Sequence, residues 1–224
     1  TASTATVTTS TTDTTAGRLL KVGDFGLGGT TTEIISDFDN FAPTGVYRYT
    51  NTTLNQPNGE SAWGKLHQTS YGTGNQSQTV LPNKTSSTQT YWFRTSNAGT
   101  WGAWRQIYHT GNILGTVSQS GGVPTGAVIE AGSNANGRYT KFADGTLICT
   151  FYTGATSGTD NTLWTFPAVF NSAPDGISAA VNTSALRFIT IPARAASSLQ
   201  MRVFNELGGG VTTGVYLTAI GRWF

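Results

Sequence analysis

Charged side chains are scarce in this chain of 224 residues. Asp, Glu, Lys and Arg together make up 11% of the sequence, against about 25% in an average globular protein. The 13 basic and 11 acidic residues are scattered, and no Lys/Arg cluster is present. The sequence therefore does not predict a nucleic-acid-binding protein, because such a protein needs a concentrated positive surface.

Cysteines and long apolar runs are also lacking. A single cysteine, Cys149, excludes an internal disulfide. No apolar run approaches the ~18 residues of a membrane-spanning helix, and the first residues lack the apolar core of a signal peptide. We therefore expect no insertion into a membrane.

Neutral polar residues take the place of the missing charges. Thr, Ser, Asn, Gln and 28 glycines dominate the sequence, a composition that suits β-sheets, contacts with sugars and close packing between chains. Residues 1–16 are a Thr/Ser/Ala tract with one valine. Because this tract has little apolar area to bury, we expect residues 1–24 to form a flexible or extended leader or the end of a shaft.

Short β-prone runs separated by turns predict a β-rich domain over residues 25–112. Convincing helical periodicity is absent, and the runs at 46–50, 90–95 and 101–104 are typical of strands. His109-Thr110-Gly111-Asn112 then marks a sharp exit. Residues 113–126, with Gly121-Gly122 and Pro124, are expected to be a connector.

A second antiparallel β domain is predicted over residues 127–224. Its clearest signal is a hairpin, in which runs 138–142 and 147–153 flank an Asp144-Gly145 turn. Further strands are expected at 163–166, 177–182, 186–191, 199–204 and 215–224, the spacing of a β-sandwich. The last run has apolar residues on both faces, which predicts burial on both sides, either centrally in the domain or against a copy of itself.

Several of these motifs resemble a known family. The aromatic-Arg run ending at Arg94, the Trp101-x-x-Trp104-Arg105 step and the Ile-Tyr-His-x-Gly-Asn exit resemble the knob module of R-type pyocin fibres and of the tail fibres of contractile-tailed, Mu-like phages. Asn136 to Thr146, the Phe166-Pro167-x-x-Phe170 step and the closing run from Ala219 to Phe224 resemble the receptor-binding tip of such fibres. From Phe25 onward, the resemblance covers about four fifths of the chain.

The resemblance implies a parallel homotrimer, intertwined or side by side, with a knob followed by a β-sandwich tip. The expected partners are a bacterial surface glycan, with lipopolysaccharide the usual target, the upstream fibre shaft and the tail baseplate. The expected location is the fibre tip of a virion or a pyocin particle, which is extracellular after host lysis.

The same resemblance bears on metal ions, because some phage fibre tips hold axial ions through a repeated His-x-His. His67 and His109 are far apart in this sequence, so no metal site of that kind and no cofactor is predicted. An axial ion held by other residues repeated threefold stays open.

Catalytic residues are not apparent, and we predict no enzyme. Cys149 alternates with Leu147 and Phe151 on an apolar strand face, which predicts a buried thiol. His109 is expected to be structural. Asp37 and Asp39 share a face if extended, and glycosidases use paired carboxylates, but this pair lies near a turn of the first domain. A monomeric carbohydrate-binding module is the chief alternative function, followed by a polysaccharide depolymerase.

Sugar recognition needs aromatic faces, amides, hydroxyls and arginine forks. Such groups lie in or beside the polar loops 154–162, 193–197 and 205–210. For each residue the alternative is an ordinary solvated connection. Two roles stay open for Arg187, Arg202 and Arg222, contact with a ligand or pairing across subunits. Core or interface positions are assigned to Trp101, Trp104 and Trp223. The candidate glycan contacts are Tyr152, Asp160, Asn161, Trp164, Arg187, Arg194, Asn205 and Glu206.

Overall fold

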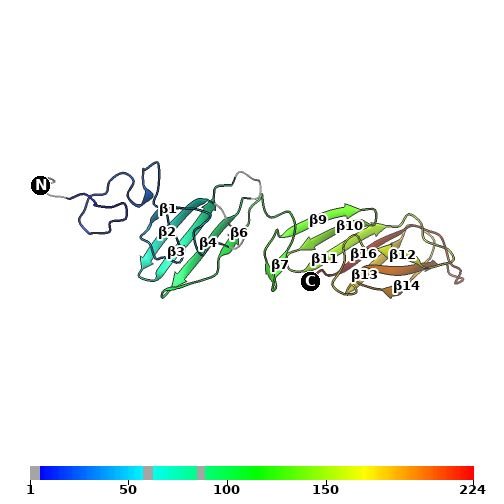
Figure 1. Ribbon diagram of the computed structural model, residues 1–224. Helices are drawn as coiled ribbons and strands as arrows, with labels where there is room; N and C mark the ends of the chain where they lie inside the picture. Colours follow the sequence, from blue (N-terminus) through cyan, green and yellow to red (C-terminus); the bar gives the residue numbers. More distant parts are fainter. Residues whose placement is uncertain (1–5, 58–62, 85–88) are drawn as a thin grey trace. The chain divides into compact units, whose positions relative to one another are not determined.

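A computed structural model describes residues 6–57, 63–84 and 89–224 (Figure 1). These residues form strands, turns and one 3-10 turn, η2 (Asp24–Gly26), with no α-helix among them. The expectation of an all-β chain is confirmed. The chain divides into two compact units, Thr1–Gly111 and Asn112–Phe224. No helix in the described part of the chain is long and apolar enough to span a membrane.

The first unit is built on a six-stranded antiparallel sheet in the order β1-β2-β3-β4-β5, with β6 also paired to β4. The expected single strand over 101–104 is wrong, because β5 ends at Trp101 and β6 begins at Arg105. The rings of Trp101 and Trp104 instead both contact the guanidinium group of Arg94. The strands are β1 (Gly45–Tyr49), β2 (Gly64–Gly72), β3 (Asn75–Pro82), β4 (Tyr91–Asn97), β5 (Thr100–Trp101) and β6 (Arg105–Ile107).

The core of this unit contains both an apolar cluster and buried polar side chains. Its apolar part joins Ile35 and Phe38, from the segment before β1, to buried side chains of β1, β2 and β3. Beside it lie three buried glutamines. The Gln68 amide donates to the carbonyl of Ala42 at 2.7 Å, and the Gln78 amide donates to the Gln68 side-chain oxygen at 2.8 Å. Because these buried amides are hydrogen-bonded, the polar side chains are tolerated inside the fold.

The segment before β1 is more ordered than its composition predicts. Asp24 is buried and accepts hydrogen bonds from the Thr8 hydroxyl and the Lys21 backbone N–H. These bonds hold the pKa of Asp24 below its ordinary value. Val7 and Leu19 also form a parallel bridge. Side-chain hydrogen bonds to the backbone therefore organise the described part of the leader where apolar burial is insufficient.

The second unit contains two larger antiparallel sheets. The five-stranded sheet has the order β13-β16-β11-β10-β9, and the three-stranded sheet has the order β12-β15-β14. The expected Asp144-Gly145 hairpin is confirmed by the pairing of β10 with β11. The strands are β9 (Ile129–Asn134), β10 (Gly137–Phe142), β11 (Thr146–Tyr152), β12 (Thr162–Thr165), β13 (Gly176–Val181), β14 (Phe188–Arg194), β15 (Ser198–Phe204) and β16 (Val215–Arg222).

Both sheets of the second unit contribute to one hydrophobic core. Leu147, Cys149 and Leu217 come from the five-stranded sheet, and Trp164 and Met201 come from the three-stranded sheet. The expected burial of Cys149 is confirmed, since its exposed fraction is 0%. Burial raises the pKa of this thiol to about 11. Cys149 is therefore a packed side chain with little thiolate at neutral pH.

Residues 113–126, expected to be a connector, are included in the second unit. β7 (Gln119–Ser120) and β8 (Val123–Pro124) form a small hairpin in this segment. Gly121 and Gly122 form its turn with φ of +58° and +81°, a backbone region that favours glycine. The Val117 N–H donates to the Glu130 carboxylate of β9 at 2.9 Å.

The last strand, β16, lies between β11 and β13 in the middle of its sheet, which is one of the two positions that the sequence left open. Its expected burial on both faces is wrong for the single chain. Val215, Leu217 and Ala219 face the core, whereas Tyr216 is 54% exposed and Ile220 is 44% exposed on the opposite face. Strand alternation alone places these apolar residues on the outside.

Candidate functional site

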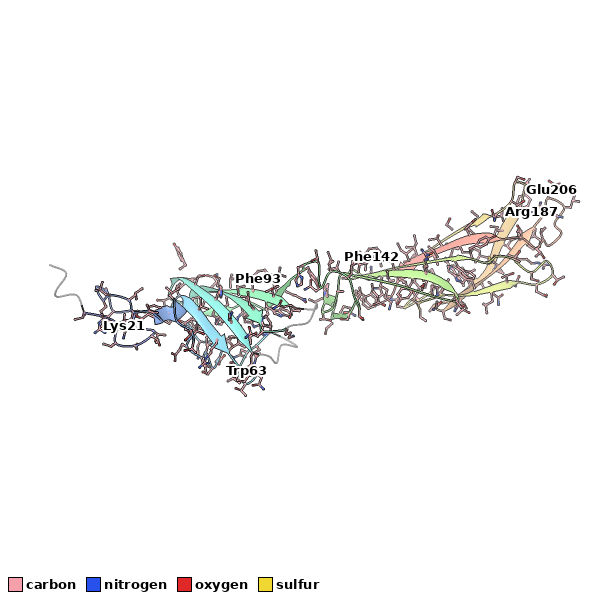
Figure 2. The ribbon with its side chains drawn as sticks, turned by 90° about the horizontal axis from the view of Figure 1, so that it is seen from above. Lys21, Trp63, Phe93, Phe142, Arg187 and Glu206 are labelled. Carbon is pink, nitrogen blue, oxygen red and sulfur yellow. The ribbon has the colours of Figure 1, made fainter. Side chains whose placement is uncertain are left out.

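Three loops meet at one end of the second unit. β11 ends opposite the start of β16, and β13 also ends there, because Tyr152 pairs with Tyr216 and Val181 with Val215. In the smaller sheet, β15 ends opposite the start of β14, where Phe204 pairs with Phe188. Figure 2 shows Arg187 and Glu206 at this end of the unit and Phe142 at the other. We call residues 153–161, 182–187 and 205–214 the loop end.

Thr156 fastens two of these loops together. It is buried, with 3% exposure. Its hydroxyl donates to the Val211 carbonyl at 3.0 Å, and its backbone N–H donates to the Thr213 carbonyl at 2.8 Å. Because the attachments use one buried hydroxyl and backbone groups, the loops are held in place while their outer side chains stay free to vary. Sequence inspection missed Thr156, since one threonine in a polar loop has no distinguishing pattern.

The loop 205–214 also has an internal cap that exposes its tip. The Asn205 side-chain oxygen accepts the N–H groups of Leu207 and Gly209 at 3.0 and 2.8 Å. Gly208 has φ of +79°. Glu206 is therefore presented to solvent, and Leu207 is 89% exposed. Asn205 therefore shapes this loop, and its side-chain oxygen is occupied by these two hydrogen bonds.

Other candidate contacts also lie at or next to the loop end. Asp160 and Asn161 are exposed, and the Asn161 amide donates to Gln200 at 3.2 Å. Arg187 uses one guanidinium nitrogen to donate to the Leu186 carbonyl at 2.8 Å. Tyr152 is 43% exposed, and its hydroxyl accepts from the Asn182 amide at 3.1 Å. This end thus offers aromatic, amide, carboxylate and guanidinium groups, which suit a hydroxyl-rich ligand.

Two candidates do not belong to this group. Trp164 is 1% exposed, packs edge-on against Phe166, and donates its indole N–H to the Asn136 carbonyl at 2.9 Å. A sugar cannot reach its ring face, so the expectation of a glycan contact at Trp164 is wrong. Arg194 is at the far end of β14 from Arg187 and donates to the Pro174 carbonyl at 3.2 Å. Both residues lie beside expected loops in the sequence. In the structure, Trp164 is buried in the core between the two sheets, and Arg194 lies at the end of β14 away from the loop end.

Adjoining the loop end is a shallow hollow on the outer face of the five-stranded sheet. It is lined in part by Arg138, Thr150, Tyr152, Tyr216 and Thr218. The two tyrosine rings lie with their centroids 4.7 Å apart at an interplanar angle of 32°. Arg138 and the two threonines were not predicted as site residues, because only the pairing of three separate strands brings them together.

The two aspartates and the histidine that were considered as catalytic groups in the first unit have structural partners. Asp37 accepts from the Asp39 N–H and the Asn55 amide, both at 2.8 Å, and Asp39 pairs with Arg94 at 2.8 Å. His109 contacts the Gln89 carbonyl and accepts the Gly111 N–H. Among the described residues, no three His, Cys, Asp or Glu side chains are grouped to hold a metal ion.

Comparison with known proteins gives a family match for the N-terminal half. Residues 3–107 match the family model described as XkdV N-terminal domain. The match spans just under half of the chain. A search of curated proteins found no relative.

Solved structures of pyocin fibres share partial likeness with the whole chain. The C-terminal part of the P. aeruginosa R2 pyocin fibre, residues 323–691, has a TM-score of 0.35 and 15% identity, covering 87% of this chain and 69% of that one. The corresponding part of the R1 fibre, residues 323–701, has a TM-score of 0.33 and 17% identity, covering 85% and 66%. An N-truncated R2-type pyocin tail fibre has a TM-score of 0.35 and 14% identity, covering 87% and 100%.

Proposed function

We propose that this chain is the distal, receptor-binding part of a phage or phage-tail-like tail fibre. The observation that carries the proposal is the family match over residues 3–107, since that domain is related to phage tail fibres. The fibre-like motifs between Arg94 and Asn112 lie at the end of the same stretch. In this proposal the chain continues an upstream shaft attached to a baseplate, and the particle leaves the producing cell by lysis.

The second unit is proposed to bind a bacterial surface glycan, with lipopolysaccharide as the expected target. The loop end supports this because it exposes polar side chains of several kinds beside Leu186 and Leu207, while Thr156 and Asn205 hold the backbone. Such a site binds weakly by itself. Repetition within a homotrimer and across several fibres would raise the effective affinity without new contacts.

A homotrimer is supported by the outer face of β11 and β16. Ile148 pairs with Ile220, Thr150 with Thr218, and Tyr152 with Tyr216. We call these six residues the central patch; in this proposal Tyr152 and the hollow it lines face the other subunits rather than a glycan. The central patch has no charged residue, and its three largest exposed side chains are between 43% and 54% accessible. Identical uncharged faces can meet without like-charge repulsion, and interface cores are depleted of charge.

Adsorption blocking tests the proposed function. The purified chain is added to candidate host strains before phage or pyocin, and attachment is counted on strains with complete and truncated lipopolysaccharide. We expect the Arg187→Gln variant to need about tenfold more protein for the same block, because one charge-assisted contact is lost. Arg194→Gln is the matched control, since it removes the same group at the opposite end of β14.

Three results would contradict the proposal. Equal blocking by all variants on every strain would mean that the loop end does not recognise a receptor. Release of shortened polysaccharide on incubation with the chain would identify a depolymerase. A chain that binds glycan as a monomer in light scattering would instead be a carbohydrate-binding module.

A further inference from the structure

The outer face of the first unit's sheet has a different character from the central patch. The strand pairings align one row of residues across the sheet, consisting of Val46, His67, Thr79, Phe93 and Arg105. The next row begins with Arg48 and Lys65, which pair directly, and continues to Leu81. A third row consists of Thr69, Ser77 and Thr95.

We define the basic face as Arg48, Lys65, His67, Phe93 and Arg105. All five side chains are exposed, and Phe93, labelled in Figure 2, is 40% accessible. The face thus combines three permanent positive charges with an aromatic ring, and a row of hydroxyls borders it.

Carboxylates are missing from these rows. In the sequence, the acidic residues of the first unit precede β1 except for Glu60, which lies outside the described residues. Within the described part of the chain, Arg48, Lys65 and Arg105 take part in no ion pair, whereas Arg18, Arg94 and Lys141 each have a carboxylate partner. Among the described residues, no carboxylate forms an ion pair with the basic face.

The pairing of Arg48 with Lys65 is unfavourable by itself. Directly opposed residues in an antiparallel pair have Cβ atoms about 4.5–5.5 Å apart, and like charges in that arrangement destabilise a sheet. An anion bound between or above them removes the repulsion and forms charge-assisted hydrogen bonds with both. The arrangement is thus better suited to a complex with an anion than to the free protein.

We propose that the basic face binds a phosphate- or carboxylate-bearing glycan of the bacterial envelope. Arg48, Lys65 and Arg105 contact the anionic groups, Phe93 offers a ring to a sugar face, and the threonine and serine row supplies hydroxyl partners. This contact lies in the first unit and uses no residue of the loop end, so it goes beyond the proposed receptor site and can be tested apart from it.

Charge favours an anionic glycan over two other possible partners of the basic face, a second copy of the chain and a nucleic acid. A second copy of the same face would bring three positive charges against three more, unlike the uncharged central patch. Proteins that hold nucleic acid electrostatically commonly neutralise about 6–10 phosphates, more than this face can match. A glycan with spaced anionic groups requires fewer cations and makes use of the aromatic ring and hydroxyls.

The test uses the full chain and a defined probe. The probe is the phosphorylated core oligosaccharide obtained from deacylated lipopolysaccharide, compared with the same oligosaccharide after chemical removal of phosphate. Binding is measured by titration calorimetry at low and at physiological ionic strength. The variants Lys65→Gln and Arg105→Gln are compared with Lys21→Gln, which removes an exposed lysine from the same unit away from the sheet. Arg187→Gln reports on the loop end.

We expect Lys65→Gln and Arg105→Gln each to weaken binding of the phosphorylated probe by about fivefold or more, with a shallower salt dependence. Lys21→Gln should stay within about twofold of the parent, and any loss on Arg187→Gln is assigned to probe bound at the loop end. The thermal midpoint of Lys65→Gln should be unchanged or raised, because a like-charge pair is removed. An unfolded variant would have a lowered midpoint instead.

Three results would overturn the proposal. The first is equal affinity for the phosphorylated and dephosphorylated probes. The second is an equal loss on Lys21→Gln, which would indicate only an effect of net charge. The third is tighter binding of a random single-stranded oligonucleotide than of the glycan probe.

Discussion

At the scale of single residues, Arg94 organises the first unit. Its Nε donates to the Gln78 oxygen at 2.8 Å, and its terminal nitrogen pairs with Asp39 at 2.8 Å. The guanidinium carbon lies 4.4 Å from the centre of the Trp101 ring and 4.3 Å from that of Trp104. Burial lowers the pKa of Arg94, and Asp39 opposes that shift. The planar cation is thus held between two aromatic rings and against a carboxylate.

Replacing Arg94 by lysine should therefore destabilise the first unit. Lysine keeps the charge but lacks the flat fork that stacks between two rings, so we expect Arg94→Lys to lower the free energy of unfolding by about 2–3 kcal/mol. Denaturant unfolding followed by tryptophan fluorescence measures this change. Asp39→Asn is the control, with an expected loss of about 1 kcal/mol or less because Asp39 is largely solvated. An unchanged midpoint for Arg94→Lys would contradict the role given to the stack.

At the scale of elements, strands with apolar alternation could be predicted and strands with polar alternation could not. The β10–β11 hairpin follows from its Asp-Gly turn and β-prone arms, and β1, β4 and β12 to β16 lie close to their expected runs. β2 and β3 were missed, although they are the longest strands of the first unit. Their inward positions include Gln68, Gln76 and Gln78. Because these buried residues are polar, the alternation of apolar and polar residues that indicates a strand is absent.

Glu130 links the β9–β10 pair to the segment before it. It accepts the Val117 N–H at 2.9 Å and the Tyr139 hydroxyl at 3.0 Å, and it faces Lys141 at 3.6 Å. Burial by itself raises the pKa of Glu130, but these three partners outweigh it and hold the pKa below the ordinary value of 4.5. The folded state therefore favours the carboxylate, and its stabilisation, present above pH 4.5, is lost as the pH falls through the folded pKa.

We expect Glu130→Gln to lower the free energy of unfolding of the second unit by about 1–2 kcal/mol at pH 7. Below the folded pKa the difference from the parent should shrink, since a protonated Glu resembles Gln. Denaturant unfolding at neutral pH and at successively lower pH values measures both quantities. Tyr139→Phe is the control, with a smaller loss of about 0.5–1 kcal/mol. A difference that stays constant down to strongly acidic pH would show that the charge of Glu130 is not responsible.

At the scale of the whole molecule, the central patch is the feature that a single chain leaves unexplained. Exposed apolar residues scattered singly are ordinary, but contiguous apolar surface marks an interaction site. Here Tyr152, Tyr216 and Ile220 lie on adjacent central strands without a charge among the six patch residues. The basic face, by contrast, is unsuited to meeting its own copy. The two faces thus support different proposed partners, a second copy of the chain and an anionic glycan.

The assembly proposal predicts that a charge in the central patch prevents oligomerisation. Ile220→Lys should yield monomers in multi-angle light scattering at concentrations where the parent is trimeric, because a desolvated lysine would face its own copies. Its fold should be retained, since Ile220 is 44% exposed in the single chain. Leu163→Lys, at an exposed apolar position on the other sheet, is the matched control and should stay trimeric. A monomeric parent would refute the proposed assembly.

The sequence by itself determined the all-β class, the Asp144-Gly145 hairpin and the burial of Cys149. These depend on local properties: turn residues, β-propensity and the period of two along each strand. Only the tertiary structure decided which residues become neighbours across strands. Packing of the two sheets buried Trp164, and pairing register aligned Arg48 with Lys65. Register depends on contacts between distant segments, and no local pattern encodes those distances.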